Sequence, residues 1–308
     1  MGTSQAIFLC PGQGSQSVAM GKAWMAASEA ARRIFAEADE ILGDDLGEPL
    51  SRLCLEGPAE TLNRTDVAQP AIYVCSVASH RGLIEADGEV TVAAAAGLSL
   101  GEYTALHLAG VFDFAEGLRL VATRGTLMQA AAETCRGGMV ALIGADEPAA
   151  EAICGEAAEG KVLVCANFNA PGQVVLSGDS EACARAVAAA RDRGLQARPL
   201  AVAGAFHSPL MQPAADGMAD ALAAATLSPP KIPVWSNVTA QPHDATDLEL
   251  LRRRLVQQIV SPVRWAQTCR GLAGGDTIRY HELAPGAILR GLMRRIDRDR
   301  KVHTHDHP

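Results

Sequence analysis

A single serine lies in a pattern that is typical of catalytic nucleophiles. Residues 97–101 read Gly-Leu-Ser-Leu-Gly and fit the motif G-x-S-x-G with Ser99 at the centre. Between a strand and a helix, this pattern forms a sharp turn that lifts the serine clear of the sheet, and its glycines relieve the crowding. The following helix would also direct free backbone N–H groups at an oxyanion. The motif predicts an enzyme that transfers acyl groups or cleaves esters, with a chance match in a glycine- and serine-containing loop as the alternative.

A nucleophilic serine needs a base, and His207 is the best-placed histidine. It lies in residues 204–209 (GAFHSP), predicted to be a loop between a strand and a helix, where catalytic groups often lie. A structural histidine is the alternative. In an α/β-hydrolase an acidic residue would follow the serine and precede the histidine. The aspartates in that interval fall in turns or in positions expected to be solvated: Asp113, Asp146, Asp179 and Asp192. No acidic third member stands out.

Arg124 is a charge on an apolar face of a predicted helix. Its neighbours three and four positions away are all apolar: Leu120, Val121, Leu127 and Met128. An arginine that faces a core needs an anionic partner, because an unpaired buried charge is costly. That partner is either a protein carboxylate such as Glu102 or a carboxylate on a substrate, held by two N–H groups.

The loop 11–16 (PGQGSQ) does not fit a nucleotide-binding fingerprint. The motif G-x-G-x-x-G fails because position 17 is serine, and a P-loop lysine is absent. The loop is interpreted as a turn that offers a backbone N–H to an oxyanion, with a tight first turn as the alternative.

Composition excludes several classes of protein. The 308 residues carry 27 Lys+Arg and 35 Asp+Glu, and the net charge of −8 argues against a protein that mainly binds nucleic acid. No apolar run approaches the roughly 20 residues that cross a bilayer, and the N-terminal residues show no signal-peptide or myristoylation pattern. The eight cysteines form no CxxC pair, which favours buried free thiols in a reducing compartment over disulfides or zinc. We expect a cytoplasmic protein without a metal.

The order of elements predicts an α/β fold interrupted by a small module. Strands are expected at 6–10, 90–96, 138–144, 162–167, 173–178, 196–202, 233–237 and 278–282. Helices are expected at 26–42, 68–84, 100–109, 114–132, 147–158, 180–193, 208–224 and 248–260. The β-α-β-β-α-β order from 138 to 202 is that of a ferredoxin-like domain. The predicted domains are a discontinuous one at 1–132 and 204–308 and a small one at 133–203. Residues 294–308 are biased in composition, and the tail that carries His303, His305 and His307 is predicted to be disordered.

Taken together, these residues resemble the malonyl-CoA:acyl carrier protein transacylase family. The resemblance covers nearly the whole chain, and several blocks in the correct order are more specific than any one motif. The blocks are 11–16, the serine motif, Arg124-Gly125 with Met128-Gln129, 167–169 leading into 171–175, 204–209, 261–265 and 285–286. The resemblance implies a hydrolase-like α/β domain with a short parallel sheet and an inserted ferredoxin-like domain, in agreement with the predicted order of elements.

The resemblance also assigns the catalytic groups. Ser99 would be the nucleophile and His207 its base. The backbone carbonyl of Gln258 would orient the histidine in place of an acidic residue, which explains the missing aspartate. The backbone N–H groups of Gln13 and Leu100 would form the oxyanion hole.

The resemblance further implies substrate-binding residues: Arg124, Phe206, Asn167 and Asn169. Arg124 would bind the free carboxylate of a malonyl group. Phe206 stands where malonyl-selective members of the family carry a bulky ring, which would crowd an α-methyl branch.

Two positions depart from the family pattern. Leu98 replaces the usual histidine before the nucleophile, and Cys10 replaces a usual phenylalanine. Leu98 removes a polar side chain beside the serine, so it bears on acyl-group choice and on unwanted hydrolysis. It leaves the serine, the base and the arginine intact.

The implied activity is transfer of malonyl from malonyl-CoA to the phosphopantetheine thiol of acyl carrier protein, through a malonyl-serine intermediate, for fatty acid synthesis. It needs no cofactor, and we expect a monomer. The alternatives are an acyltransferase for a polyketide synthase or malonate decarboxylase, a serine thioesterase or hydrolase, and an inactive carrier-binding module. Carrier proteins are acidic, and a basic cluster at 290–301 is either a docking surface or a solvated helix face.

Overall fold

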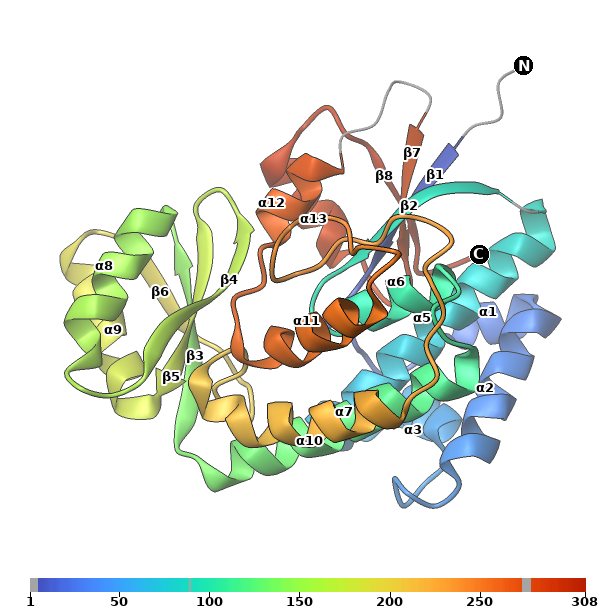
Figure 1. The fold of residues 1–308 in the computed structure, drawn as a ribbon, viewed down its shortest axis with the longest axis horizontal. Helices are drawn as coiled ribbons and strands as arrows, with labels where there is room; N and C mark the ends of the chain where they lie inside the picture. Colours follow the sequence, from blue (N-terminus) through green and yellow to red (C-terminus); the bar gives the residue numbers. More distant parts are fainter. Residues whose placement is uncertain (1–4, 89, 273–277) are drawn as a thin grey trace.

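Two β-sheets organise the chain (Figure 1). The computed structural model describes residues 5–88, 90–272 and 278–308; residues 1–4, part of the segment in which we expect no signal peptide, lie outside the described residues. One sheet is parallel and lies among most of the helices, whereas the other is antiparallel and lies at the left of Figure 1. The predicted α/β class with a hydrolase-like domain and an inserted module is confirmed.

The parallel sheet has the order β2-β1-β7-β8. Its strands are β1 (Gln5–Cys10), β2 (Thr91–Gly97), β7 (Ile278–Leu283) and β8 (Val302–His305). Successive side chains of β1 enter different hydrophobic clusters: Phe8 packs on one face of the sheet, and Ile7 and Leu9 on the other. Because helices cover both faces, β1 is an uninterrupted apolar run rather than an alternating one.

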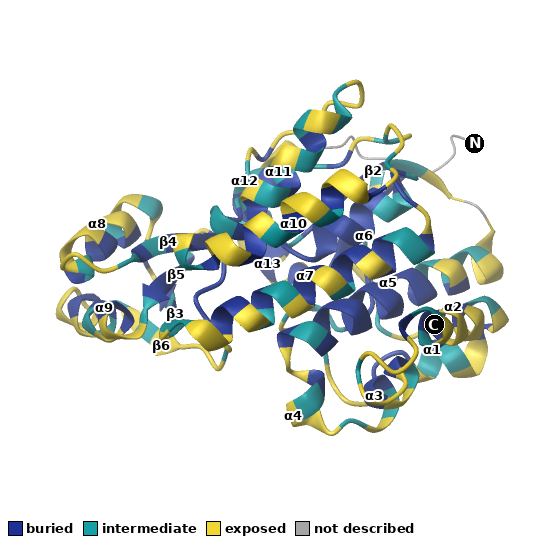
Figure 2. Ribbon diagram, turned by 60° about the horizontal axis from the view of Figure 1, so that its bottom comes forward, coloured by how far each residue is buried: buried dark blue, intermediate teal, exposed yellow. Residues whose placement is uncertain are grey.

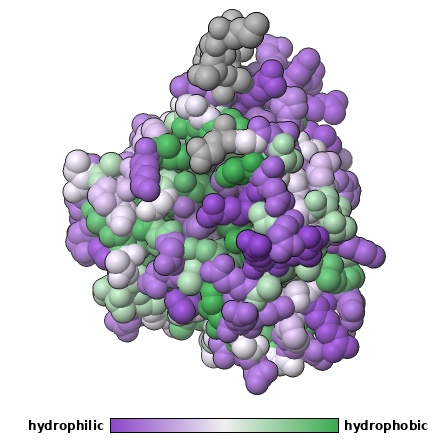
Figure 3. All heavy atoms as spheres, turned by 90° about the vertical axis from the view of Figure 1, so that its right-hand side faces the viewer, coloured by the Kyte–Doolittle hydropathy of each residue, from purple (hydrophilic) through white to green (hydrophobic). Residues whose placement is uncertain are grey.

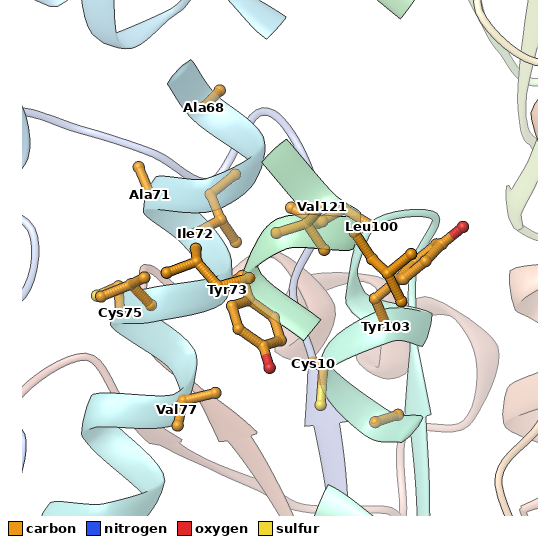
Figure 4. Close-up of a cluster of buried hydrophobic side chains, with 14 of the residues drawn as sticks. Cys10, Ala68, Ala71, Ile72, Tyr73, Cys75, Val77, Leu100, Tyr103 and Val121 are labelled. Atoms are coloured by element: carbon orange, nitrogen blue, oxygen red, sulfur yellow. The ribbon is translucent and has the colours of Figure 1, made fainter. Parts of the chain in front are cut away.

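Helices α5 (Thr65–Asp87) and α7 (Phe114–Thr134) form the centre of the core. Most of α5 is buried (Figure 2). In Figure 4, Ile72 and Tyr73 of α5 lie beside Val121 of α7 and near Leu100 at the start of α6 (Gly101–Leu108). This packing holds α6, and with it the turn that carries Ser99, against α5 and α7.

The remaining helices surround this core. They are α1 (Lys22–Ala27), α2 (Glu29–Leu42), α3 (Leu50–Glu56), α4 (Ala59–Leu62), α10 (Gln212–Ala224), α11 (Leu248–Val260), α12 (Trp265–Gly271) and α13 (Ile288–Ile296). The helix predicted at 26–42 is instead two helices. Ser28 has extended backbone angles and its Oγ accepts a hydrogen bond from the Ala31 N–H, which begins α2 at Glu29.

The antiparallel sheet has the order β4-β5-β3-β6. Its elements are β3 (Gly137–Ile143), α8 (Glu147–Ala158), β4 (Leu163–Ala170), β5 (Gln173–Asp179), α9 (Ser180–Asp192) and β6 (Gln196–Pro199). Both helices lie on one side of this sheet (Figure 1), and their apolar faces build a separate core. This is the predicted β-α-β-β-α-β order. The boundaries at 132/133 and 203/204 stay predictions.

Two further expectations are wrong. Residues 233–237 make only isolated bridges, Ala95 with Val234 and Trp235 with Pro242, because Pro233 has no N–H to extend a ladder. The tail is ordered: β8 pairs in parallel with β7, Val302 is buried, and the Trp24 indole donates to the His305 carbonyl oxygen. Its composition predicted disorder, but an edge of the parallel sheet supplies backbone partners.

The surface that carries α1 and α2 mixes hydrophilic and hydrophobic residues (Figure 3). The large hydrophobic side chains exposed to solvent lie far apart in the sequence: Val18, Val90, Leu200 and Ile288. Among the described residues, no helix has the length and hydropathy required to cross a membrane.

Candidate active site

The turn between β2 and α6 holds Ser99 in a strained conformation. Ser99 has φ +53°, in the left-handed region that non-glycine residues rarely adopt. A Cβ at Gly97 would lie 1.9 Å from the carbonyl carbon of Gly101, and one at Gly101 would lie 2.1 Å from the Cys10 oxygen. Both glycines of the motif are therefore required, because β2, α6 and the end of β1 meet without room for a side chain.

Ser99, His207 and Gln258 form a hydrogen-bonded chain. The Ser99 Oγ lies 2.8 Å from the His207 Nε2, and the His207 Nδ1 lies 2.8 Å from the backbone oxygen of Gln258. A carbonyl oxygen only accepts, so Nδ1 carries the proton and Nε2 presents its lone pair to the serine hydroxyl. A backbone carbonyl thus occupies the position that an acidic residue holds in a Ser-His-Asp triad.

Burial keeps this histidine neutral. Loss of solvation, followed by the nearby charge of Arg124, lowers the pKa of His207 from 6.5 to about 4. A base that is neutral at its site accepts the serine proton without first losing one to solvent.

The pH dependence of the reaction should report this shift. We expect kcat/KM to fall as pH drops through about 4, where His207 becomes protonated, rather than through the ordinary histidine value near 6.5. Stopped-flow acylation across this range, with circular dichroism as a control for folding, measures the acidic limb. An inflection centred near 6.5 would contradict the assigned environment of His207.

Arg124 is buried beside the serine, and its hydrogen-bond partners among the described residues are all neutral oxygens. Its side chain is 1% exposed, Nη1 donates to the Gln69 Oε1 at 2.7 Å, and Nη2 lies 3.1 Å from the Ser99 Oγ and 2.8 Å from the Gln258 Oε1. Its Nε has no hydrogen-bond partner among the described residues. Desolvation lowers the pKa of Arg124, and the neighbouring Tyr103 and Glu102 partly offset this effect. A buried cation with neutral partners is suited to a substrate anion.

The alternative in which Glu102 neutralises Arg124 is wrong. No ion pair joins these two side chains within the described part of the chain. The Glu102 carboxylate instead contacts His243, the Gln258 side chain and the Asn237 backbone N–H. These donors occupy the Glu102 oxygens, so no carboxylate of the described residues forms an ion pair with the Arg124 guanidinium.

A cavity of about 500 Å³ opens over the serine. It is lined by nearly all the residues singled out from the sequence: Gln13, Leu98, Ser99, Leu100, Arg124, Asn167, Asn169, Phe206 and His207. Gln258 lies behind His207. The backbone N–H groups of Gln13 and Leu100 donate to no other group among the described residues, which leaves them available to an oxyanion. The structure brings these residues together at one cavity.

Several polar partners of the site were not predicted from the sequence. Asn237 accepts a 2.6 Å hydrogen bond from the Ser99 N–H through Oδ1 and donates to the Gly97 oxygen, which fixes the turn. Gln69 on α5 contacts Arg124. No motif marks either residue, because each becomes adjacent to Ser99 only through the fold. The four aspartates considered earlier do not contact His207; Asp113 and Asp146 cap helices α7 and α8.

The strand-turn-helix serine, its histidine and the inserted domain define an acyl-transferring α/β enzyme. A family model described as "Acyl transferase domain" matches residues 7–295, so the chain belongs to the acyl transferase domain family. The predicted family resemblance is confirmed.

Within this family, the chain is similar to individual malonyl transacylases. The chain is 43% identical to the malonyl CoA-acyl carrier protein transacylase of Salmonella typhimurium, over 95% of this chain and 93% of the relative. It is similar to the crystal structure of malonyl-CoA:acyl carrier protein transacylase from Xanthomonas oryzae pv. oryzae, with TM-score 0.92, 41% identity, and 100% and 96% of the two chains covered. A malonyl-transacylase in complex with a type II polyketide acyl carrier protein matches with TM-score 0.92, 38% identity, and 99% and 97% covered.

Proposed function

We propose that this enzyme transfers the malonyl group from malonyl-CoA to the phosphopantetheine thiol of acyl carrier protein, for fatty acid synthesis. The observation that carries the proposal is Arg124, a buried guanidinium with neutral partners, whose Nη2 lies 3.1 Å from the Ser99 Oγ. A bound malonyl carboxylate supplies the missing anion and places the thioester carbon near the serine. The high identity to transacylases over nearly the full chain supports the same activity.

The geometry supports a two-step reaction. His207 Nε2 takes the Ser99 hydroxyl proton while Oγ attacks the thioester carbonyl, and the Gln13 and Leu100 N–H groups stabilise the oxyanion. Collapse of this intermediate breaks the carbon–sulfur bond, and His207 returns the proton to the CoA sulfur. In the second step His207 takes the proton of the carrier thiol, whose sulfur attacks the malonyl-serine ester. The carbon–oxygen bond of the ester then breaks, and His207 returns the proton to the leaving Ser99 Oγ.

Two features of the cavity bear on acyl-group choice. Phe206 and Leu98 line the cavity, and we propose that the Phe206 ring disfavours an α-methyl branch. Asn167 and Asn169 of β4 line the same cavity, in positions to contact the acyl or pantetheine portion.

All eight cysteines are free, and this supports our assignment to a reducing, cytoplasmic compartment.

Acyl-enzyme mass tests the activity. Exposure to malonyl-CoA should add one malonyl group to the intact protein, while methylmalonyl- and acetyl-CoA should react more slowly. Addition of acyl carrier protein should then discharge the adduct. Rapid release of free malonate without an acceptor would instead indicate a hydrolase. The structure of a relative with a polyketide carrier favours a second candidate acceptor, so both types of carrier protein belong in the discharge assay.

A basic groove beside the cavity is our candidate for carrier docking. Arg294, Arg295 and Arg298 line a hollow of about 740 Å³ together with Pro171 and Gly291. Arg294 and Arg295 lie on helix α13, which also lines the active-site cavity through Ile288 and Leu292. Arg300 belongs to the basic cluster by sequence but turns inward, where it contacts the Cys269 oxygen and Asp297.

Charge reversal tests this groove. The double variant Arg294→Glu/Arg295→Glu should raise the KM for acyl carrier protein by roughly tenfold, because surface charges of a docking site control association. Arg253→Glu/Arg254→Glu on α11 serves as a control with the same change in charge. Unchanged transfer kinetics would remove the docking assignment, and a defect confined to acylation by malonyl-CoA would show that the groove serves CoA instead.

A further inference from the structure

A buried carboxylate lies behind the catalytic residues and is absent from the two-step reaction described above. Glu102, on α6, is 1% exposed. Its Oε1 lies 2.7 Å from the His243 Nε2, and its Oε2 accepts from the Gln258 Nε2 at 2.7 Å and from the Asn237 backbone N–H at 3.0 Å. Every one of these donors is buried, so the group is a closed network rather than a surface ion pair.

The carboxylate determines which way the Gln258 amide faces. An ionised carboxylate only accepts hydrogen bonds, so the NH₂ end of the amide must face Glu102. The oxygen end then faces Arg124, whose Nη2 donates to it at 2.8 Å, while Nε2 also donates to the Ser99 backbone oxygen at 3.0 Å. If the amide were flipped, its oxygen would face the Glu102 carboxylate and place two acceptors together. Its NH₂ group would face the Arg124 guanidinium and place two donors together. One residue thus connects the carboxylate to the guanidinium.

His243 completes the network. Its side chain is fully buried, and among the described residues its Nδ1 has no hydrogen-bond partner. Among the described residues, the one side-chain hydrogen bond of the ring is therefore that of Nε2 with Glu102, where it supplies a donor to Oε1. Without that donor, one oxygen of a buried carboxylate would be unsatisfied, which is costly. His243 therefore holds the Glu102 carboxylate in place through this hydrogen bond.

We propose that Glu102 and His243 are positioning residues that, through the Gln258 amide, aim Arg124 at the substrate carboxylate. They thereby set the preference for malonyl over uncharged acyl groups. This inference rests on the proposed function. A guanidinium fixed before the substrate arrives loses less freedom on binding, and it can form two parallel hydrogen bonds to a carboxylate.

The ratio of kcat/KM for malonyl-CoA over acetyl-CoA distinguishes a role in positioning Arg124 from a role in stabilising the fold. We expect His243→Leu and Glu102→Met to lower the ratio of kcat/KM for malonyl-CoA over acetyl-CoA by roughly tenfold or more, since a misaimed guanidinium forms poorer hydrogen bonds to the carboxylate. Acylation of Ser99 is followed by rapid quench and intact mass for both substrates. A residue that only supports the fold would slow both substrates equally and leave the ratio unchanged, which would overturn the proposal.

Conservative variants keep the test decisive where the apolar variants fail to fold. His243→Gln retains an N–H donor for Glu102 and should restore most of the ratio. Glu102→Gln can still offer an oxygen to the Gln258 amide and should lower the ratio less than Glu102→Met does. Gln267→Met on α12, outside this network, controls for substitution in the same domain. If His243→Gln lowers the ratio as much as His243→Leu, the proposal is wrong. Absence of a malonyl adduct on the unaltered enzyme would instead refute the proposed function.

Discussion

Replacing Ser99 with alanine is expected to abolish the malonyl-enzyme adduct and to lower the transfer rate on the order of 10⁴-fold or more, as for other nucleophilic serines. In the part of the chain that the structure describes, this hydroxyl is the only group that lies 2.8 Å from the His207 Nε2 and also within reach of Arg124. Its removal deletes the covalent step but leaves the cavity and Arg124, so binding of malonyl-CoA should persist. Intact mass after exposure to malonyl-CoA measures the adduct, and equilibrium binding measures the retained affinity.

A matched control comes from the small domain. Ser177 on β5 is buried, its Oγ has no hydrogen-bond partner among the described residues, and it does not line the cavity. Ser177→Ala should therefore form the adduct at nearly the normal rate. Persistence of the adduct in Ser99→Ala would show that another residue is the nucleophile, and the reaction proposed here would fail with it.

The sequence predicted the groups that carry a local signal and missed those that do not. Ser99 lies in a motif whose two glycines the tight turn requires, and Arg124 stands out as a charge on an apolar helix face. By contrast, the group that orients His207 is a backbone carbonyl, which any residue type supplies, so only the family resemblance pointed to Gln258. Glu102 and His243 are 141 residues apart and meet only in the fold. Neither the periodicity nor the spacing of residues in the sequence predicts that these two side chains are close.

The elements of the fold were likewise predicted where their signal is local and missed where they depend on tertiary contacts. Helices 147–158 and 248–260 were predicted with the bounds that the structure has, because their apolar periodicity and capping aspartates are local. The tail was predicted to be disordered because it is polar, yet β8 is held by backbone hydrogen bonds to β7, which do not depend on side-chain hydropathy. Residues 233–237 have the composition of a buried strand, but the chain there touches β2 only at one bridge.

Replacing Arg124 with alanine is expected to reduce kcat/KM for malonyl-CoA by roughly 30- to 4,000-fold, the range for losing one partner of a buried, hydrogen-bonded charge pair. The loss for acetyl-CoA should be far smaller, because acetyl has no carboxylate to pair with the guanidinium. Both substrates share the thioester, the oxyanion hole and His207, so their comparison isolates the distal charge. Acylation kinetics with the two substrates provide the measurement.

Arg124→Lys distinguishes charge from geometry. Lysine keeps the positive charge but has no planar pair of N–H groups, so it should recover only part of the malonyl preference. Equal losses for malonyl- and acetyl-CoA in Arg124→Ala would show that the arginine supports the site structurally, through Gln69 and Gln258. A selective loss has a different consequence: the side chain that donates to Ser99 Oγ without substrate would be the same one that recognises the acyl group. Substrate binding would then redirect hydrogen bonds of Arg124 from neutral protein oxygens to the malonyl carboxylate beside the nucleophile.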